Sequence, residues 1–376
     1  MKTKKLLICS LVLFLTVQMS AQNLAVYVSD AANFNSGPWN ISKFDDSGNF
    51  VGQLINADDG IVWPQDIIFL DNEEAVLISN LSAAGIISKH NWATGALIEN
   101  FAEGLGGPTR MKIGPDGLLY VIQWSTTNNK ILRFQLDGTP LGEFTQIGVS
   151  NSIGIDWDAN GDLYVSSYGT STIHKFNGND GSYIGVWNDS DLQGPTNIWF
   201  EDDGNLIVLN YNSGIIRRFD PAGNAIADLV TGVAGCEGFD FFPNGDILIG
   251  VGSDGSIRKY DSDFNFIENF HNPDPDVLLT PNAIVIRPDV PLSVSEKAID
   301  STFIIPTIGS RFRLLANPAV TTKTFQIFDS QGHLVETTKL EADVVWNAQA
   351  YMEGVYFIVA KMSDGKQFTQ KVIVKK

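Results

Sequence analysis

The feature that most constrains this 376-residue chain is a segment that occurs four times and ends each time in an Asp-Gly or Asn-Gly turn. The four copies are residues 108–117, 152–161, 195–204 and 236–245. Their turn glycines are separated by 44, 43 and 41 residues, and a short apolar run follows each glycine. A repeat at this period indicates one supersecondary unit that is copied and packed against its neighbours.

Each repeat is predicted to form four β-strands. In the second copy, residues 153–157 and 163–167 form a hairpin around Asn160-Gly161, two residue types that tolerate the positive φ of a tight turn. Residues 172–176 and 183–187 form an outer pair around Asn177-Gly178. A four-stranded unit of about 40 to 45 residues has the size of one β-propeller blade. The sequence therefore predicts an all-β propeller.

Two further copies lack the clean turn but keep the spacing. One is formed by residues 64–69 and 75–79, and the other is a single inner strand at residues 281–286. The start of the chain supplies three outer strands without an inner one, at residues 25–29, 41–44 and 50–54. We predict that these first and last segments complete a sixth blade, so that the ring closes and no sheet edge is left open.

Two inner strands carry a recognisable pattern, Gly154-Ile155-Asp156-Trp157 and Gly238-Phe239-Asp240-Phe241. They resemble the NHL family of propellers, whose inner strand reads roughly Pro-x-Gly-Ile-x-Val before an Asp-Gly turn. The resemblance covers residues 24–287 and implies a six-bladed propeller domain, which we place at residues 22–287. It implies no particular activity, because this fold hosts lyases, lactonases, adhesive modules and scaffolds alike.

The first 21 residues have the composition of a secretory signal peptide. Basic residues Lys2, Lys4 and Lys5 precede an apolar run at 6–17, and small residues precede the cleavage that we predict before Gln22. The run is too short for a membrane span, and no other stretch is long and apolar enough to cross a bilayer. Cleavage would leave Cys236 as the only cysteine, so we expect no disulfide within the mature protein.

The charge is divided unequally along the chain. Residues 22–299 carry 36 acidic and 13 basic residues, a net charge of −23, whereas residues 300–376 carry 7 acidic and 9 basic residues, a net charge of +2. This shift, together with Pro288 and Pro291, predicts a linker at residues 288–299 between two domains. The negative charge of the first domain argues against nucleic acid as a partner.

The last 77 residues carry the most specific motifs in the chain. They are Ile-Phe-Asp-x-x-Gly-x-Leu-Val at 327–335, Gly-Val-Tyr-Phe at 354–357 and Lys-Val-Ile-Val-Lys-Lys at 371–376. These motifs resemble the C-terminal sorting domain of type IX secretion cargo, which is found in Bacteroidota. The resemblance implies a small β-sandwich over residues 300–376, a partner in the type IX machinery, and passage through the periplasm to the cell surface or the medium. A generic immunoglobulin-like domain is the alternative.

The chain lacks the common catalytic motifs. It contains no Gly-x-Ser-x-Gly elbow, no His-Glu-x-x-His, no phosphate loop and no Cys-x-x-Cys pair. NHL-type lyases use histidines near the central channel, and none of the four histidines here falls on a predicted inner strand. The sequence therefore favours a non-enzymatic role.

The starts of the inner strands line the mouth of the channel in a propeller, and here they carry polar residues. Aligned on the turn glycines, two successive positions hold Gln65 and Asp66, Thr109 and Arg110, Ile153 and Gly154, Thr196 and Asn197, Glu237 and Gly238, and Asn282 and Ala283. We select five of these residues, from five blades, as candidate ligand-binding residues: Asp66, Arg110, Asn197, Glu237 and Asn282. We expect their side chains to be hydrated.

Four of these candidates offer oxygen ligands that suit calcium or magnesium: Asp66, Asn197, Glu237 and Asn282. Gluconolactonase-like propellers bind a divalent cation through one Glu, two Asn and one Asp at such positions, although their order around the ring differs. The alternative, which we favour, is that no cofactor binds and that Asp66 pairs with Arg110 on the next blade.

Two tryptophans near predicted loops, Trp63 and Trp124, are further candidates for exposed ligand contacts. The function that we predict is an exported propeller acting as a non-catalytic binding or scaffold module for a glycan, a peptide or a protein. The alternative is a metal-dependent hydrolase or lactonase that works at the mouth of the channel.

Overall fold

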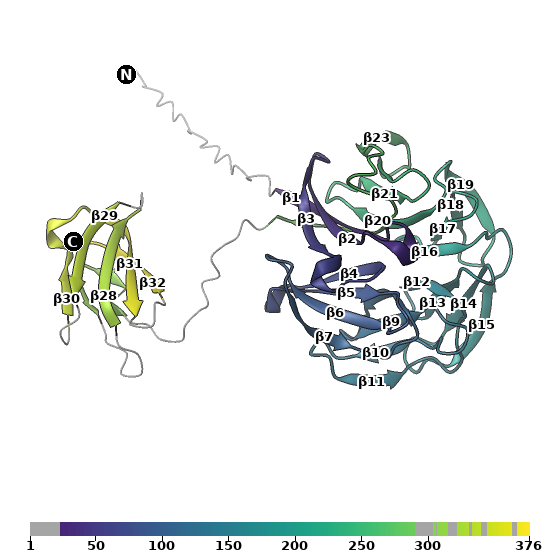
Figure 1. The fold of residues 1–376 in the computed structure, drawn as a ribbon, viewed down its shortest axis with the longest axis horizontal. Helices are drawn as coiled ribbons and strands as arrows, with labels where there is room; N and C mark the ends of the chain where they lie inside the picture. The colour runs from purple at the N-terminus through teal and green to yellow at the C-terminus, as the bar shows by residue number, and fades with distance from the viewer. Residues whose placement is uncertain are drawn as a thin grey trace, which may run out of the picture. The chain divides into compact units, whose positions relative to one another are not determined.

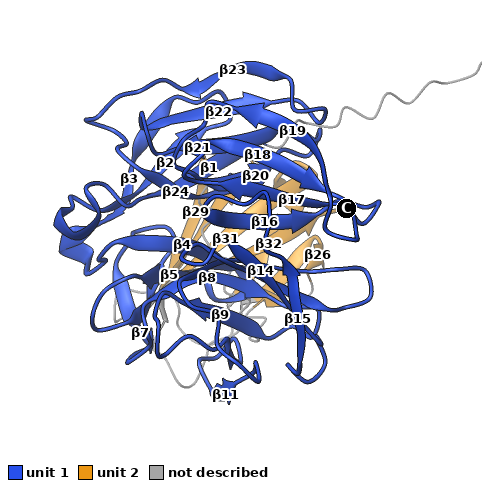
Figure 2. Cartoon of the chain, turned by 90° about the vertical axis from the view of Figure 1, so that its right-hand side faces the viewer, with its two compact units in different colours: residues 1–290 blue, residues 291–376 orange. Residues whose placement is uncertain are grey.

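A computed structural model of the protein describes residues 23–289, 304–305, 307–314, 322–330, 333–339, 344–362 and 367–376. The chain divides into two compact units, residues 1–290 and 291–376, which are coloured separately in Figure 2. The predicted signal peptide and residues 290–299 of the predicted linker lie outside the described residues. Among the residues that the structure describes, no helix has the length and apolar character needed to cross a membrane.

Within residues 23–289, the structure contains six four-stranded antiparallel sheets (Figure 1). From inner to outer strand, the first three are β24 (Pro281–Pro288), β1 (Leu24–Asp30), β2 (Asn40–Asp45), β3 (Phe50–Asn56); β4 (Pro64–Leu70), β5 (Ala75–Asn80), β6 (Ile86–Asn91), β7 (Leu97–Ala102); and β8 (Pro108–Ile113), β9 (Leu119–Gln123), β10 (Leu132–Phe134), β11 (Pro140–Glu143). The other three are β12 (Ser152–Trp157), β13 (Leu163–Ser167), β14 (Thr172–Phe176), β15 (Tyr183–Asn188); β16 (Pro195–Phe200), β17 (Leu206–Asn210), β18 (Ile215–Phe219), β19 (Ala225–Thr231); and β20 (Cys236–Phe241), β21 (Ile247–Val251), β22 (Ser256–Tyr260), β23 (Phe266–His271). Three short 3₁₀ turns complete this part of the chain: η1 (Phe34–Ser36), η2 (Ala57–Asp59) and η3 (Asp71–Glu73).

The inner strands of the six sheets form a closed ring. Strands β4, β8, β12, β16 and β20 contact one another in sequence order, and β24 contacts both β20 and β4. The predicted pairing of the first and last segments is present, because β24 pairs antiparallel with β1. The buried carboxylate of Asp30 strengthens this closure by accepting the N–H groups of Thr280 (2.7 Å) and Leu279 (3.1 Å).

The turn glycines adopt the conformation that the repeat requires. Gly117, Gly161, Gly204 and Gly245 have φ between 77° and 90°. In the sheet that lacks a turn glycine, Glu74 occupies the same left-handed region with φ 53°. Because non-glycine residues rarely adopt this conformation, the sequence pattern is weaker in that sheet.

The predicted Asn177-Gly178 turn is wrong in one detail. The left-handed glycine of that loop is Gly181, with φ 71°. Gly178 is needed for space instead, since a Cβ built there would lie 1.7 Å from the carbonyl oxygen of Gly161. Gly178 therefore allows the outer hairpin to lie against the inner one.

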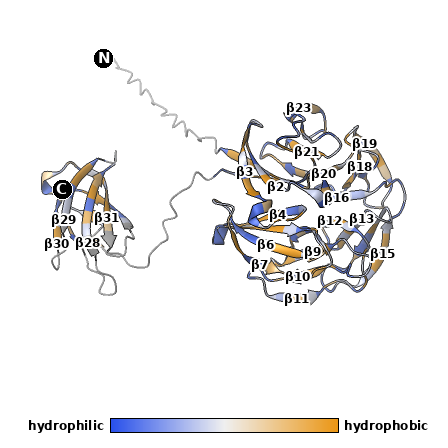
Figure 3. Cartoon of the chain, viewed as in Figure 1, coloured by the Kyte–Doolittle hydropathy of each residue, from blue (hydrophilic) through white to orange (hydrophobic). Residues whose placement is uncertain are grey.

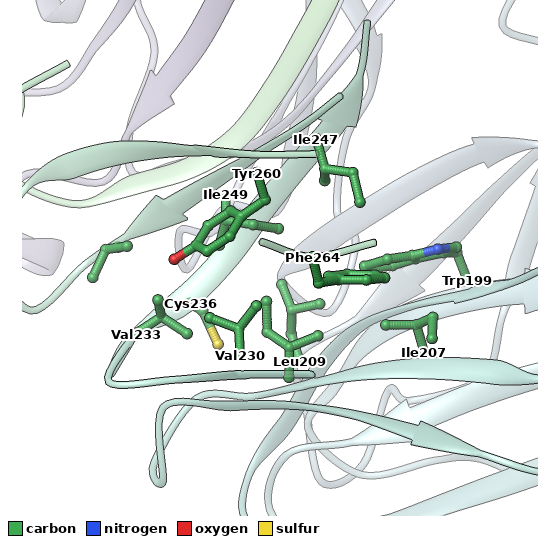
Figure 4. Close-up of a cluster of buried hydrophobic side chains, with 12 residues drawn as sticks. Trp199, Ile207, Leu209, Val230, Val233, Cys236, Ile247, Ile249, Tyr260 and Phe264 are labelled. Carbon is green, nitrogen blue, oxygen red and sulfur yellow. The ribbon is translucent and has the colours of Figure 1, made fainter. Parts of the chain in front are cut away.

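Apolar side chains fill the space between neighbouring sheets, and Figure 3 shows hydrophobic residues concentrated in the strands. Figure 4 shows one such cluster, between the β16–β19 and β20–β23 sheets, in which Cys236 lies beside Val230 and Val233. Cys236 is a free cysteine with no exposed surface, and its burial raises the pKa of its thiol to about 12. This thiol is a packing residue, not a nucleophile.

Every inner strand carries a register shift close to its start. On the five inner strands that open a sheet, the shifts lie between Pro64 and Asp66, Pro108 and Met111, Ser152 and Ile155, Pro195 and Ile198, and Cys236 and Phe239. A bulge redirects side chains locally and ends strict alternation. Successive residues at these starts can therefore both reach the centre of the ring.

The described residues of the second unit form two sheets. The three-stranded sheet contains β25 (Ile304–Ile305), β27 (Arg311–Leu314) and β30 (Val344–Asn347), which is followed by η4 (Ala348–Ala350). The five-stranded sheet contains β26 (Ile308–Gly309), β32 (Gln367–Val374), β31 (Gly354–Met362), β28 (Thr322–Asp329) and β29 (Leu334–Lys339). Both sheets contribute to one core, in which Phe312 and Trp346 cluster with Ile327, Ile358 and Val372.

Candidate ligand-binding site

Two cavities are lined by the starts of the inner strands, and they share no lining residue. The smaller, of 210 Å³, has mostly aromatic walls, and we call it the cup. The larger, of 470 Å³, lies farther along the inner strands, and we call it the basal cavity.

The two aligned positions of the repeat contribute to different cavities. Gln65, Ile153, Glu237 and Asn282, at the first position, line the cup. Asp66, Arg110, Asn197 and Ala283, at the second position, line the basal cavity. One step along a bulged strand therefore moves a side chain from one cavity to the other.

Arg110 lies between the two cavities and is 4% exposed. Its Nε donates to Oδ1 of Asn197 (3.1 Å), and its Nη2 donates to Oε1 of Glu237 (2.9 Å) and to the carbonyl oxygen of Asn282. Arg110 belongs to β8, whereas these partners belong to β16, β20 and β24 on the other side of the ring. The side chain thus crosses the channel. Its Nη1 is buried and has no hydrogen-bond partner among the described residues.

The expected pairing of Asp66 with Arg110 does not describe the contacts that form. The salt bridge of Arg110 is with Glu237, and Oδ2 of Asp66 accepts the backbone N–H of Met111 (2.7 Å) instead. The expectation that the candidate side chains are hydrated is also wrong for Arg110, Glu237 and Asn282, which are at most 5% exposed. The reason is the length of arginine, which lets it reach the opposite wall and close the channel.

The four candidate metal ligands do not fit a calcium or magnesium site. The Arg110 guanidinium already occupies Oδ1 of Asn197 and Oε1 of Glu237. The Asn282 carbonyl oxygen also accepts from Arg110, and Asp66 accepts from backbone N–H groups. A divalent cation placed among these oxygens would face a buried positive charge at hydrogen-bond distance, which is strongly unfavourable.

Burial dominates the protonation of the acidic groups in the channel. Loss of solvent raises the pKa of Glu237 to about 7, the guanidinium of Arg110 opposes this shift, and the charge of Asp66 adds to it. The pKa of Asp66 is raised for the same main reason. Burial, with a contribution from the charge of Glu237, raises the pKa of Tyr211 to about 12. The Tyr211 hydroxyl is therefore protonated and available as a donor at neutral pH.

The walls of the cup come from loops of five sheets. Trp63 packs edge-on against Phe34 (5.6 Å between ring centroids), Trp124 lies against Tyr168 (5.4 Å), and Tyr168 meets Tyr211 (5.7 Å). Both sequence-predicted tryptophans are thus lining residues, although each is half-buried.

Trp63 is held in an unusual state. Its backbone φ of 46° is a costly conformation for a bulky side chain, and strain of this kind clusters at functional sites. Its indole Nε1 is buried without a hydrogen-bond partner among the described residues.

The floor of the cup has unused hydrogen-bonding capacity. Gln65 and Asn282 are 3% and 2% exposed, and neither side-chain amide hydrogen-bonds to another described residue. Glu237 uses only Oε1, in its contact with Arg110, which leaves Oε2 without a partner among the described residues. Buried polar side chains usually have partners, so a floor of three such groups can serve as a set of ligand contacts.

Sequence reasoning missed Gln65 as a floor residue and missed the walls formed by Phe34, Tyr168 and Tyr211. A usable signal was present for the two tyrosines. Trp124, Tyr168 and Tyr211 each lie seven residues after a turn glycine, so one repeat position is aromatic in three successive copies.

Comparison with known proteins adds the export route. Residues 310–375 match the secretion system C-terminal sorting domain. This domain engages the type IX secretion machinery, so the protein is delivered to the cell surface or the extracellular space. No curated protein sequence matches the chain.

Solved structures show the fold of the first unit. The chain is similar to a protein of unknown function from Bacteroides caccae (16% identity, TM-score 0.54, covering 70% of this chain and 98% of the other). It is also similar to a chain of a nidogen/laminin complex (14%, 0.56, 70% and 98%) and to a putative 6-phosphogluconolactonase from Bacteroides fragilis (14%, 0.50, 71% and 98%). At these identities the likeness shows a β-propeller fold and no activity.

Proposed function

We propose that this protein is a non-catalytic binding module that holds its ligand in the cup of a six-bladed, NHL-like β-propeller. A signal peptide at residues 1–21 starts its export from a Bacteroidota cell. A linker at residues 288–299 then joins the propeller to a sorting domain of β-sandwich form at residues 300–376.

The observation that carries this proposal is the floor of the cup. Gln65, Glu237 and Asn282 are buried, face one small cavity, and keep hydrogen-bonding groups that no described residue uses. A buried donor or acceptor without a partner costs about 1–3 kcal/mol. A ligand that supplies the missing partners would remove this cost, and the aromatic walls would add apolar contact.

The alternative function, a metal-dependent hydrolase or lactonase, lacks support from the site. The oxygens that would hold the metal converge on the guanidinium of Arg110. We therefore propose a site that works without calcium or magnesium. The acidic first unit also makes nucleic acid an unfavourable partner, which leaves a glycan, a peptide or a protein.

The test is a binding screen of the full chain against glycan and peptide arrays, followed by recovery of any bound ligand. We expect Trp124→Ala to weaken binding at least tenfold, and we expect mass spectrometry to recover the ligand unchanged after long incubation. A matched control is Phe266→Ala, which removes an exposed aromatic ring of β23 outside the cup. Conversion of the ligand would overturn the non-catalytic role, and equal loss of binding in the control would overturn the site.

A further inference from the structure

The cup is small and has a closed floor. Its 210 Å³ lies below the roughly 300–1,000 Å³ of pockets that hold drug-sized ligands. Arg110 crosses the channel beneath the floor through its bonds to Glu237 and to the Asn282 carbonyl. A ligand can therefore insert one ring from the open side but cannot thread through the channel.

The charges of the floor cancel locally. The carboxylate of Glu237 lies 2.9 Å from Nη2 of Arg110, so its charge is already compensated. A cationic ligand would gain little from Glu237 and would approach the buried guanidinium. An anionic ligand would have to approach a unit of strongly negative net charge. Both charged classes are thus disfavoured against a neutral one.

The floor chemistry matches hydroxyl groups. Each amide of Gln65 and Asn282 offers both a donor and an acceptor, and Oε2 of Glu237 offers an acceptor. A hydroxyl both donates and accepts, so a ring that carries several hydroxyls satisfies all three side chains at once. Tyr211 adds a phenol that burial keeps protonated.

The walls suit the carbon-bound faces of such a ring. The rings of Trp63, Trp124, Tyr168 and Tyr211 all line the cup and present apolar surface above the polar floor. Aromatic side chains combine a large apolar face with a polar edge, which suits a ligand with one apolar face and a hydroxyl-rich edge.

We propose that the cup binds one neutral sugar ring at the end of a glycan chain. This inference rests on the proposed function, because it names the ligand class of the same site. The remaining residues of the glycan extend out of the cup, and recognition is limited to the terminal ring and its linkage.

The experiment is an array of glycans with neutral, anionic and amine-bearing terminal residues, probed with the full chain. The neutral hits are then measured by calorimetry as methyl glycosides. We expect binding to neutral termini, with affinity that is insensitive to salt because no net charge is neutralised. We expect Gln65→Met, which keeps the side-chain length but removes the amide, to weaken binding at least tenfold, about 1.4 kcal/mol. Phe266→Ala should bind as the unmodified protein does, and melting temperatures identify any variant that fails to fold.

The outcomes separate the two proposals. Binding of peptides or of charged termini through the cup, without neutral sugars, overturns the ligand class and leaves the binding function in place. Binding of neutral sugars that Gln65→Met and Trp124→Ala leave unchanged overturns the site. Absence of binding across both arrays overturns both proposals.

Discussion

Replacing Arg110 with methionine should be among the most damaging single changes in the channel. The side chain is 4% exposed and donates to Asn197, Glu237 and the Asn282 carbonyl. Removing one partner of a buried ion pair leaves the other charge uncompensated and typically costs about 3–5 kcal/mol. We expect Arg110→Met to lower the free energy of unfolding by this amount, measured by urea denaturation at pH 8.

The cost should depend on pH because Glu237 can be protonated. Its folded pKa of about 7 lies above the ordinary value of 4.5, so its contribution to stability is fully present below about 4.5 and is lost as pH rises through 7. Removal of the guanidinium takes away the charge that lowers this pKa, so the loss at high pH should grow. Arg110→Met should therefore be less harmful at pH 5 than at pH 8, and adding Glu237→Gln should recover part of the stability.

Arg217 supplies the matched control, since its guanidinium pairs with Asp228 near the surface, where the two side chains are 19% and 41% exposed. We expect Arg217→Met to cost at most about 1 kcal/mol, with little change between pH 5 and pH 8. If Arg110→Met costs no more than this control, or costs the same at both pH values, the account of Arg110 as the buried charge of the channel is refuted.

Three further predictions concern closure, processing and the thiol. Truncation before Pro281 should give insoluble or protease-sensitive protein, because it removes β24 and opens the ring, whereas truncation after residue 290 should leave the melting temperature of the first unit unchanged. The exported protein should lack residues near 300–376, and intact mass spectrometry that finds a C-terminal peptide ending in Lys376 would contradict this. Cys236 should react with a thiol reagent only when denaturant is added, because it is buried and its thiol pKa is about 12; labelling at the rate of a free peptide thiol would show that the core opens.

The sequence predicted the strands well because the repeat fixes their period. Residues 172–176 match β14, and the other predicted strands differ from the observed ones by one or two residues at an end. The turn chemistry was less reliable where a residue other than glycine adopts a left-handed conformation, as Glu74 does. Gly178 was misassigned because its role is close packing, which a turn dipeptide does not reveal.

The site was only partly predictable. The aligned positions placed Arg110, Asn197, Glu237 and Asn282 on the ring, and the structure brings these four together. Which residue Arg110 contacts could not be read from the chain, because proximity along the repeat favours the adjacent strand and the side chain spans to the opposite one. The bulges that direct the two aligned positions into separate cavities carry no sequence pattern that we could identify.

The pairing of β1 with β24 also sets the order in which the first unit can be completed. The two strands are separated by some 250 residues, so this contact is among the most non-local in the fold and should form late. Until Pro281–Pro288 has been synthesised, the edge of Leu24–Asp30 has no inner neighbour and could pair with another chain. A growing chain is thus exposed to mispairing until its final strand emerges, and proteins that hold nascent chains apart would raise the yield of folded product.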